Sequence, residues 1–176
     1  NASQGPPLTG TIDGNPKYCW SSTNTSVAGS DNGLFLYQPI EDVTRCQGKH
    51  TFSFWAMADA ARPVAVEFIQ HFGTGGSPSA NITSIGVQKV TLGTTFARYS
   101  VTVDLPSISG KTLGTNADSA LWIIIWMDAG SSFNGRTNSL GQQSGNFYIA
   151  RGKFEQGEVA TPYEPKNYSE DFLDCC

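Results

Sequence analysis

Hydrophobic and polar residues alternate along most of the chain, which is the pattern of β-strands with one buried face. The alternation is clearest at residues 50–58, where Phe52, Phe54 and Ala56 share one face with His50 and Ala58. It recurs at residues 63–72 and 97–105. We expect strands at Gly33 to Ile40, His50 to Ala58, Pro63 to Phe72, 84 to 92, Ala97 to Leu105, Ala120 to Met127 and Gly145 to Glu155, with a short one at Tyr18 to Trp20.

The segment Ala120 to Met127 is apolar on both faces, which predicts a central strand covered on both sides. Within 63–72, Val64, Val66 and Phe68 are expected opposite Ala65, Glu67 and Ile69, and within 97–105 the inward residues are expected to be Tyr99, Val101, Val103 and Leu105. Seven or eight strands separated by Gly, Pro, Ser and Asn turns predict an all-β protein, an antiparallel β-sandwich of jelly-roll type.

The domain organisation follows from the same pattern. Residues 1–32 are predicted to be an extended arm or linker, because they carry Gly, Pro and Asn without periodicity, and residues 33–176 the sandwich. The only helix candidate is a short C-terminal turn at Ser169 to Cys176. Two long loops, 73–84 and 128–144, are candidates for function or for packing on a partner.

Composition narrows the partners. Charged residues make up 15% of the chain, against roughly 25% in an ordinary soluble domain, so the surface is uncharged and polar or is partly covered. A net charge of −4 without a run of Lys or Arg disfavours nucleic acid. The longest apolar run, from Ala120 to Met127, is far shorter than the roughly 20 residues of a membrane span, so we expect no membrane insertion.

Cysteine and carboxylate spacing gives no sign of a metal centre or an enzyme. Cys19, Cys46, Cys175 and Cys176 show no zinc-ligand spacing and are predicted to be thiols, with a Cys19–Cys46 disulfide as the open alternative. Neither His50 nor His71 lies near a GxSxG elbow, and the carboxylates form no pair at a spacing diagnostic of glycoside hydrolysis. We therefore predict that the protein is not an enzyme.

Carbohydrate binding suits this composition better, because sugars stack on aromatic faces and bond to amides, carboxylates and guanidinium groups. The aromatic candidates are Trp55, Trp122, Trp126, Tyr37, Phe133 and Tyr148, although tryptophans within strands are expected mainly in the core. The freer candidates lie in the second long loop. The predicted ligand-binding residues are Phe133, Asn134, Arg136, Asn138, Gln142 and Gln143.

The C-terminal third carries a family resemblance. The run GNFYIARGKFEQGEVATPYEPKNYSEDFLDC, from Gly145 to Cys175, resembles the ending of a module widespread in tail fibres and other virion appendages of tailed bacteriophages, with a block E-x-G-x-x-ATP-[FY]-E and a later Cys. The matching residues are Phe154, Glu155, Gly157, Ala160, Thr161, Pro162, Tyr163, Glu164, Glu170, Phe172 and Cys175. The chain departs from that pattern at Gly152-Lys153, and it stops at Cys176, where the family continues with Arg-Tyr-Tyr.

This resemblance implies a β-sandwich like that of carbohydrate-binding modules, exposed on a phage particle and repeated by symmetry. We therefore expect a virion structural protein, a trimeric fibre or appendage module that contacts other virion proteins and host surface polysaccharide. Weak sites then gain strength from simultaneous engagement of several copies. The alternatives are a capsid decoration, cement or fibre-base protein without sugar binding, and a carbohydrate-binding module of a secreted glycosidase. No cofactor is expected; a structural calcium ion is compatible with such sandwiches, although spacing assembles no ligand set.

Overall fold

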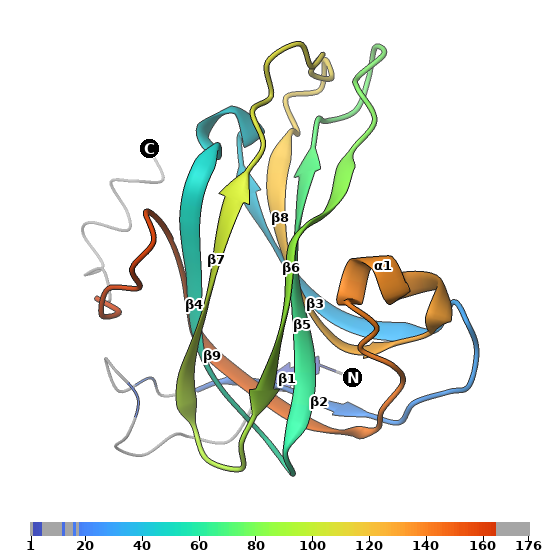
Figure 1. Cartoon of the computed structure of the whole chain (residues 1–176), viewed down its shortest axis with the longest axis vertical. Helices are drawn as coiled ribbons and strands as arrows, with labels where there is room; N and C mark the ends of the chain where they lie inside the picture. Colours follow the sequence, from blue (N-terminus) through green and yellow to red (C-terminus); the bar gives the residue numbers. More distant parts are fainter. Residues whose placement is uncertain (1, 5–11, 13–15, 17, 165–176) are drawn as a thin grey trace.

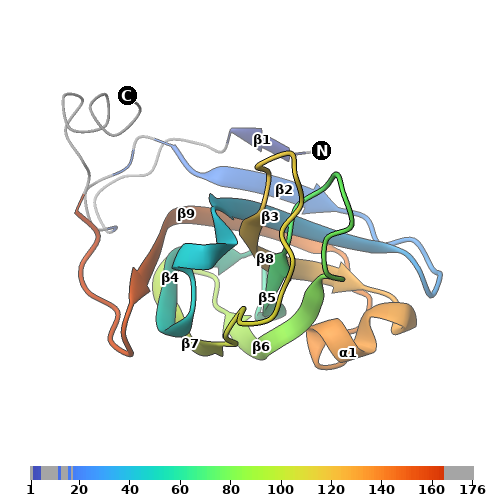
Figure 2. The ribbon, with the colours of Figure 1, turned by 90° about the horizontal axis from the view of Figure 1, so that it is seen from above.

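Two antiparallel sheets face each other in the computed structural model, which describes residues 2–4, 12, 16 and 18–164. Figure 1 shows the sandwich from its side, and Figure 2 shows the two layers from above. The five-stranded sheet has the order β1-β2-β9-β4-β7, and the four-stranded sheet has the order β3-β8-β5-β6. The strands are β1 (Ala2–Gln4), β2 (Trp20–Asn24), β3 (Gly33–Glu41), β4 (Gly48–Ala58), β5 (Arg62–His71), β6 (Ile82–Leu92), β7 (Ala97–Leu105), β8 (Ala120–Ala129) and β9 (Gly145–Gln156).

The predicted all-β jelly-roll sandwich is confirmed. Every strand pair in the two sheets is antiparallel, and consecutive strands often lie in different sheets, as the Greek-key connections of a jelly roll require. Three short helical segments interrupt the connections: η1 (Val43–Arg45), η2 (Ser131–Phe133) and α1 (Asn134–Thr137). Among the described residues no helix has the length and apolar character to cross a membrane.

The alternation of residue types places side chains as predicted. In β5, Val64, Val66 and Phe68 enter the core between the sheets, whereas Ala65 and Ile69 belong to a second cluster on the outer face of the four-stranded sheet. The inward residues of β4 and β7 pack in the same inter-sheet core. These two apolar faces of β5 explain why its sequence carries few polar residues.

The prediction for β8 is also confirmed. This strand lies between β3 and β5, with Ile123 and Ile125 in the inter-sheet core and Ile124 and Trp126 in the outer cluster. A strand that is covered on both faces needs apolar residues at consecutive positions, and residues 120–127 provide them.

The sandwich begins earlier than the predicted boundary at residue 33. Strand β2 pairs with β9 from Trp20 opposite Ile149 to Asn24 opposite Gly145, so this part of the predicted arm belongs to the five-stranded sheet. Its sequence, WSSTN, gives little hydrophobic alternation; backbone pairing to β9 holds it. Residues 1, 5–11, 13–15 and 17 of the predicted arm, and the predicted helical turn at Ser169 to Cys176, lie outside the described residues.

Cys19 and Cys46 are free, buried thiols, as predicted. Cys46 lies in the inter-sheet core, whereas Cys19 lies with Ile12 and Ala150 in a cluster on the five-stranded sheet. Burial raises the pKa of both thiols. Both are therefore expected to be protonated and unreactive in the folded protein.

Candidate functional site

Exposed aromatic rings gather on the outer face of the four-stranded sheet. Phe35 and Tyr37 on edge strand β3 are 46% and 54% exposed, at alternate positions that face away from the core. The ring centroids of Tyr37 and Trp122 are 6.1 Å apart, and His71 stacks on Trp122 at 4.5 Å. We call Phe35, Tyr37, Trp122 and His71 the aromatic platform.

The strand register creates a hollow at one end of the platform. Ala120 is paired with Glu41 on one side and with His71 on the other, so a small side chain stands between two larger ones. Neighbouring strands are about 4.8 Å apart, which puts Glu41 and His71 roughly 10 Å apart across Ala120. The resulting cavity has a volume of about 900 Å³. It is lined by Pro39, Glu41, Asp42, His71, Leu113, Gly114, Thr115, Ala117, Asp118, Ser119, Ala120 and Trp122.

Hydrogen bonds between two loops hold the wall of this hollow. The connection between β7 and β8 meets the connection between β5 and β6 at the top of Figure 1. The Gly114 amide donates to the Phe72 carbonyl at 2.8 Å, and the Ser79 amide donates to the Thr112 carbonyl at 2.9 Å. Asp118 accepts from the backbone and the hydroxyl of Thr74, at 2.7 and 2.5 Å. The wall is thus ordered before any ligand arrives.

The carboxylates that line the hollow differ in whether they form hydrogen bonds within the protein. Hydrogen bonds from Thr44 lower the pKa of Asp42, and hydrogen bonds from Thr74 lower the pKa of Asp118. Both groups are therefore anionic at neutral pH, with their oxygens engaged. Glu41 has no side-chain hydrogen bond or ion pair with any described residue, and its exposed carboxylate remains available.

A polar cluster fastens the α1 segment over the rest of the same sheet face. The buried Glu67 carboxylate accepts two hydrogen bonds from the Arg136 guanidinium at 2.9 and 3.0 Å, one from the Trp126 indole at 2.9 Å and one from the Ser84 amide at 2.9 Å. Phe133 packs on Trp126, with the ring centroids 4.9 Å apart. This cluster leaves the aromatic platform as the uncovered part of the face.

Four of the six predicted ligand-binding residues are engaged within the protein. Phe133 and Arg136 belong to the cluster just described, and the Arg136 side chain is only 31% exposed. The Gln143 amide donates to the Pro63 and Met127 carbonyls, and the Gln142 side chain bonds the backbone of residues 27 and 29. Asn134 and Asn138 are exposed, with no side-chain hydrogen bond to a described residue.

The sequence predicted Tyr37 and Trp122 as aromatic binding candidates, although not as neighbours. It did not predict Glu41, His71 or Ala120 as ligand-binding residues. The missing information is the register of β3 against β8 and of β8 against β5. Alternation alone places Tyr37 and Trp122 on some face of a sheet, whereas only the pairing brings them to the same place. One signal was present: the smallest residue of the apolar β8 run is its first, Ala120.

A second cavity, of about 390 Å³, is an apolar groove between the sheets along edge strand β3, and a third, of about 400 Å³, is lined by residues that include the predicted Asn134 and Gln142. Leu36, Ile40, Ile123, Ile149 and Phe154 provide most of the surface of the apolar groove. The groove offers few groups that could bond to a hydroxyl, so it suits a sugar poorly. No cluster of three or more His, Cys, Asp or Glu side chains that could hold a metal ion occurs among the residues that the structure describes.

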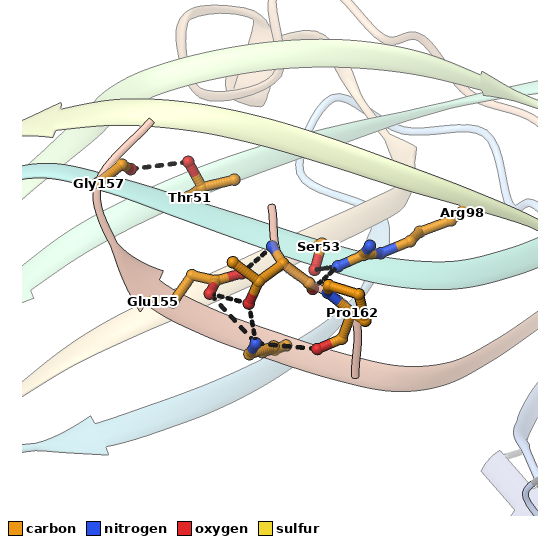
Figure 3. A network of polar contacts seen from close by, with 8 residues as sticks. Thr51, Ser53, Arg98, Glu155, Gly157 and Pro162 are labelled. Carbon is orange, nitrogen blue, oxygen red and sulfur yellow. Dashed lines mark hydrogen bonds and ion pairs between the residues drawn. The ribbon is translucent and has the colours of Figure 1, made fainter. Parts of the chain in front are cut away.

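The block that carries the family resemblance folds back against the five-stranded sheet (Figure 3). Glu155 accepts two hydrogen bonds from Thr161, and Lys153 contacts Glu155, Thr161 and the Pro162 carbonyl. Arg98 of β7 donates to the Ser53 hydroxyl and to the Thr161 carbonyl. Gly157 has φ of +107°, a conformation that favours glycine, where the chain reverses. We call residues 157–164 the closing segment.

Comparison by sequence identifies no relative: no family model matches the chain, and no curated protein matches it. Solved structures do share its fold. The chain is similar to a candidate sugar-binding protein from Bacteroides thetaiotaomicron, with 16% identity, a TM-score of 0.51 and coverage of 89% of this chain and 82% of that one.

Two other similar structures have lower scores. One is a CBM4 structure, with 19% identity, a TM-score of 0.47 and coverage of 79% of this chain and 71% of that one. The second is the enzymatically active domain of tailspike protein 4 of bacteriophage CBA120, with 14% identity and a TM-score of 0.49. The match covers 89% of this chain but 18% of the tailspike chain. At 16% identity, the similarity to the candidate sugar-binding protein shows the fold alone.

Proposed function

We propose that the protein is a non-catalytic glycan-binding module and that the aromatic platform with its hollow is the binding site. The observation that carries the proposal is the pairing of Tyr37 and Trp122 beside a cavity edged by free hydrogen-bonding groups. An aromatic face offers the C–H surface of a sugar ring a stacking partner, and carboxylates accept bonds from its hydroxyls. The similarity to a candidate sugar-binding protein supports the same function.

The electrostatics of the hollow favour binding over hydrolysis. A glycosidase needs one carboxyl group that is protonated at working pH as well as one that is ionised. The pKa values of Asp42 and Asp118 are both lowered, by hydrogen bonds from Thr44 and Thr74, so neither is suited to be the acid. We infer that Asp42 and Asp118 do not form the acid and base pair of a glycosidase.

Affinity electrophoresis and calorimetry against a panel of soluble oligosaccharides test this proposal. We expect Tyr37→Ala to weaken binding of the retained glycan at least tenfold, which is about 1.4 kcal/mol, and Trp122→Ala to abolish it. Tyr18→Ala, which removes another exposed tyrosine near the five-stranded sheet, is the matched control and should bind normally. Binding that is unchanged in the Tyr37 and Trp122 variants would refute this site.

We propose further that the module is part of a phage virion surface, where several copies engage the host together. The resemblance of the closing segment and its flanks to phage appendage modules supports this setting, and weak single sites fit a multivalent particle. A trimer with other virion proteins as neighbours is the assembly that we expect. The predicted loop residues Asn134 and Asn138, which are exposed beside α1, are proposed as further contacts to a longer glycan.

Imaging of the particle with a labelled antibody against this protein would test the setting. Label on a tail or capsid appendage supports it. Particles that lack the protein and still adsorb to host cells at the wild-type rate, but break more easily, would instead favour a cement protein without sugar binding. A protein found in secreted culture fluid, joined to a glycosidase, would favour the third alternative.

A further inference from the structure

The charges around the hollow indicate which glycans it accepts. We propose, on the basis of the proposed binding site, that Glu41 selects uncharged sugars by accepting their hydroxyl groups and that the hollow excludes glycans with carboxylate, sulfate or phosphate groups. The selecting feature is the position of Glu41 opposite His71 across Ala120, in a hollow that Trp122 also lines.

Three carboxylates line the hollow, and no Lys or Arg is among the described residues that line it. Asp42 is paired with Arg45, which is not a lining residue, so Glu41 and Asp118 are the lining carboxylates without an ion pair to a described Lys or Arg. A single unit charge about 6 Å from a like charge reduces affinity roughly threefold in water, and more where solvent is partly displaced. An acidic sugar seated here would meet several such repulsions, so we expect a penalty of about tenfold or more.

Glu41 differs from the other two lining carboxylates because no described residue forms a hydrogen bond or an ion pair with its side chain. Thr44 and Arg45 engage Asp42, and Thr74 engages Asp118. A carboxylate that already accepts hydrogen bonds from the protein contributes its charge to the electrostatic field of the site. A carboxylate without such partners can in addition accept two hydrogen bonds from adjacent sugar hydroxyl groups. The outward direction of Glu41 is fixed by strand alternation, since Tyr37 and Pro39 on the same strand face are also exposed.

Selection by Glu41 also requires space above Ala120 for the sugar ring. The Ala120 side chain is a single methyl group, and it lies between the larger side chains of Glu41 and His71, with which Ala120 is paired. The Asp42 amide donates to the Ser119 carbonyl at 2.9 Å, which ties β3 to the wall of the hollow beside that space. Trp122 and Glu41 both line this space, so a sugar ring that enters it meets both side chains.

The experiment compares neutral and acidic ligands of similar length at pH 8 in low salt. Cello-, xylo-, galacto- and chito-oligosaccharides are the neutral probes, and oligogalacturonate is the acidic one. We expect the wild-type protein to bind one or more neutral probes and to bind oligogalacturonate at least tenfold more weakly than galacto-oligosaccharide.

Variants at Glu41 test whether this residue selects between neutral and acidic glycans. Glu41→Gln should weaken neutral binding severalfold and reduce the discrimination against oligogalacturonate, and Glu41→Lys should reverse the discrimination. The control is Asp104→Lys, which makes the same charge change at an exposed position of β7 in the other sheet. It should leave the discrimination against oligogalacturonate unchanged. Ala120→Leu should block all probes by filling the hollow, and a thermal melt establishes that the variant is folded at the assay temperature.

The outcomes separate the two proposals. If no neutral probe binds, or if binding survives in the Tyr37 and Trp122 variants, the glycan site itself is wrong. If neutral probes bind through those residues but oligogalacturonate binds equally well, or if Glu41→Lys behaves like Asp104→Lys, the selection by Glu41 is wrong and the site remains.

Discussion

Glu155 holds Thr161 by two hydrogen bonds, one from the Thr161 amide at 2.8 Å and one from its hydroxyl at 2.6 Å (Figure 3). The two residues are six positions apart, and Gly157 provides the left-handed backbone between them. The spacing E-x-G-x-x-x-T is therefore a device that folds the closing segment back onto its own strand. This gives a physical reason for the residue types on which the family resemblance depends.

The first prediction concerns this pair. Glu155→Gln and Thr161→Val should each destabilise the protein by about 0.5–1.5 kcal/mol, since each weakens charge-assisted hydrogen bonds in a partly exposed place. The double variant should cost less than the sum of the two. Urea unfolding of the four proteins measures this coupling, and strictly additive changes would show that the two side chains do not depend on each other.

The second prediction follows from the direction of the carboxyl pKa values. Desolvation raises the pKa of Glu155, but hydrogen bonds from Thr161 and Lys153 outweigh it, so the pKa lies below the ordinary value of 4.5. A lowered folded-state pKa gives stability that is present above the unfolded pKa and is lost as pH falls through the folded pKa. Hydrogen bonds lower the pKa values of Asp42, Asp59 and Asp118 in the same way, below 3.8.

Stability should therefore be nearly constant between pH 5 and 7 as far as these groups are concerned, and should fall below about pH 4.5. Thermal melts across this range measure the profile. Glu155→Gln removes one of the four groups, so its stability at pH 7 should be lower and its decline in acid shallower. A variant profile parallel to that of the wild type would exclude Glu155 as a contributor.

The strands and their faces could be predicted because each follows from a local rule. Two-residue periodicity identified β4, β5 and β7, and the unbroken apolar run identified β8 as central. Strands β1 and β2 were the exceptions, since each is a short polar strand that is stabilised by its partner strand and leaves no periodic signal.

The site was less predictable because it depends on pairing. Arg136 and Gln143 are the polar side chains of a long loop, which is where ligand contacts are often found, yet here they bond to Glu67 and to backbone carbonyls. Glu67 is a buried charge on an otherwise apolar strand, so a partner cation is required. Which of the cations in the chain meets it depends on how the α1 segment packs, which the sequence pattern does not show.

The third prediction tests this buried pair. Arg136→Met should destabilise the protein by about 2–3 kcal/mol, because the buried Glu67 carboxyl group loses two of its four hydrogen bonds. Arg45→Met is the control: its side chain is 81% exposed in the pair with Asp42, and its removal should change stability little. Urea unfolding compares them. Equal midpoints for the two variants would contradict a structural role for Arg136.

The fourth prediction links the wall of the hollow to the close approach of two loops. A Cβ atom on Gly114 would overlap the backbone nitrogen and oxygen of Thr74, neither of which can rotate away. Gly114→Ala should therefore push the loops apart, at a cost of about 1–3 kcal/mol. It should also weaken glycan binding, since Asp118 and the lining around it depend on the same contact.

Gly135→Ala is the matched control for that variant. A Cβ atom at Gly135 meets no atom within 4 Å, and the residue lies in α1, where alanine is favoured over glycine by roughly 0.5–1 kcal/mol. It should leave binding unchanged and raise the thermal midpoint slightly or not at all. If Gly114→Ala unfolds and binds like Gly135→Ala, the hollow does not depend on the contact between Gly114 and Thr74, and its wall must be held by the remaining loop hydrogen bonds alone.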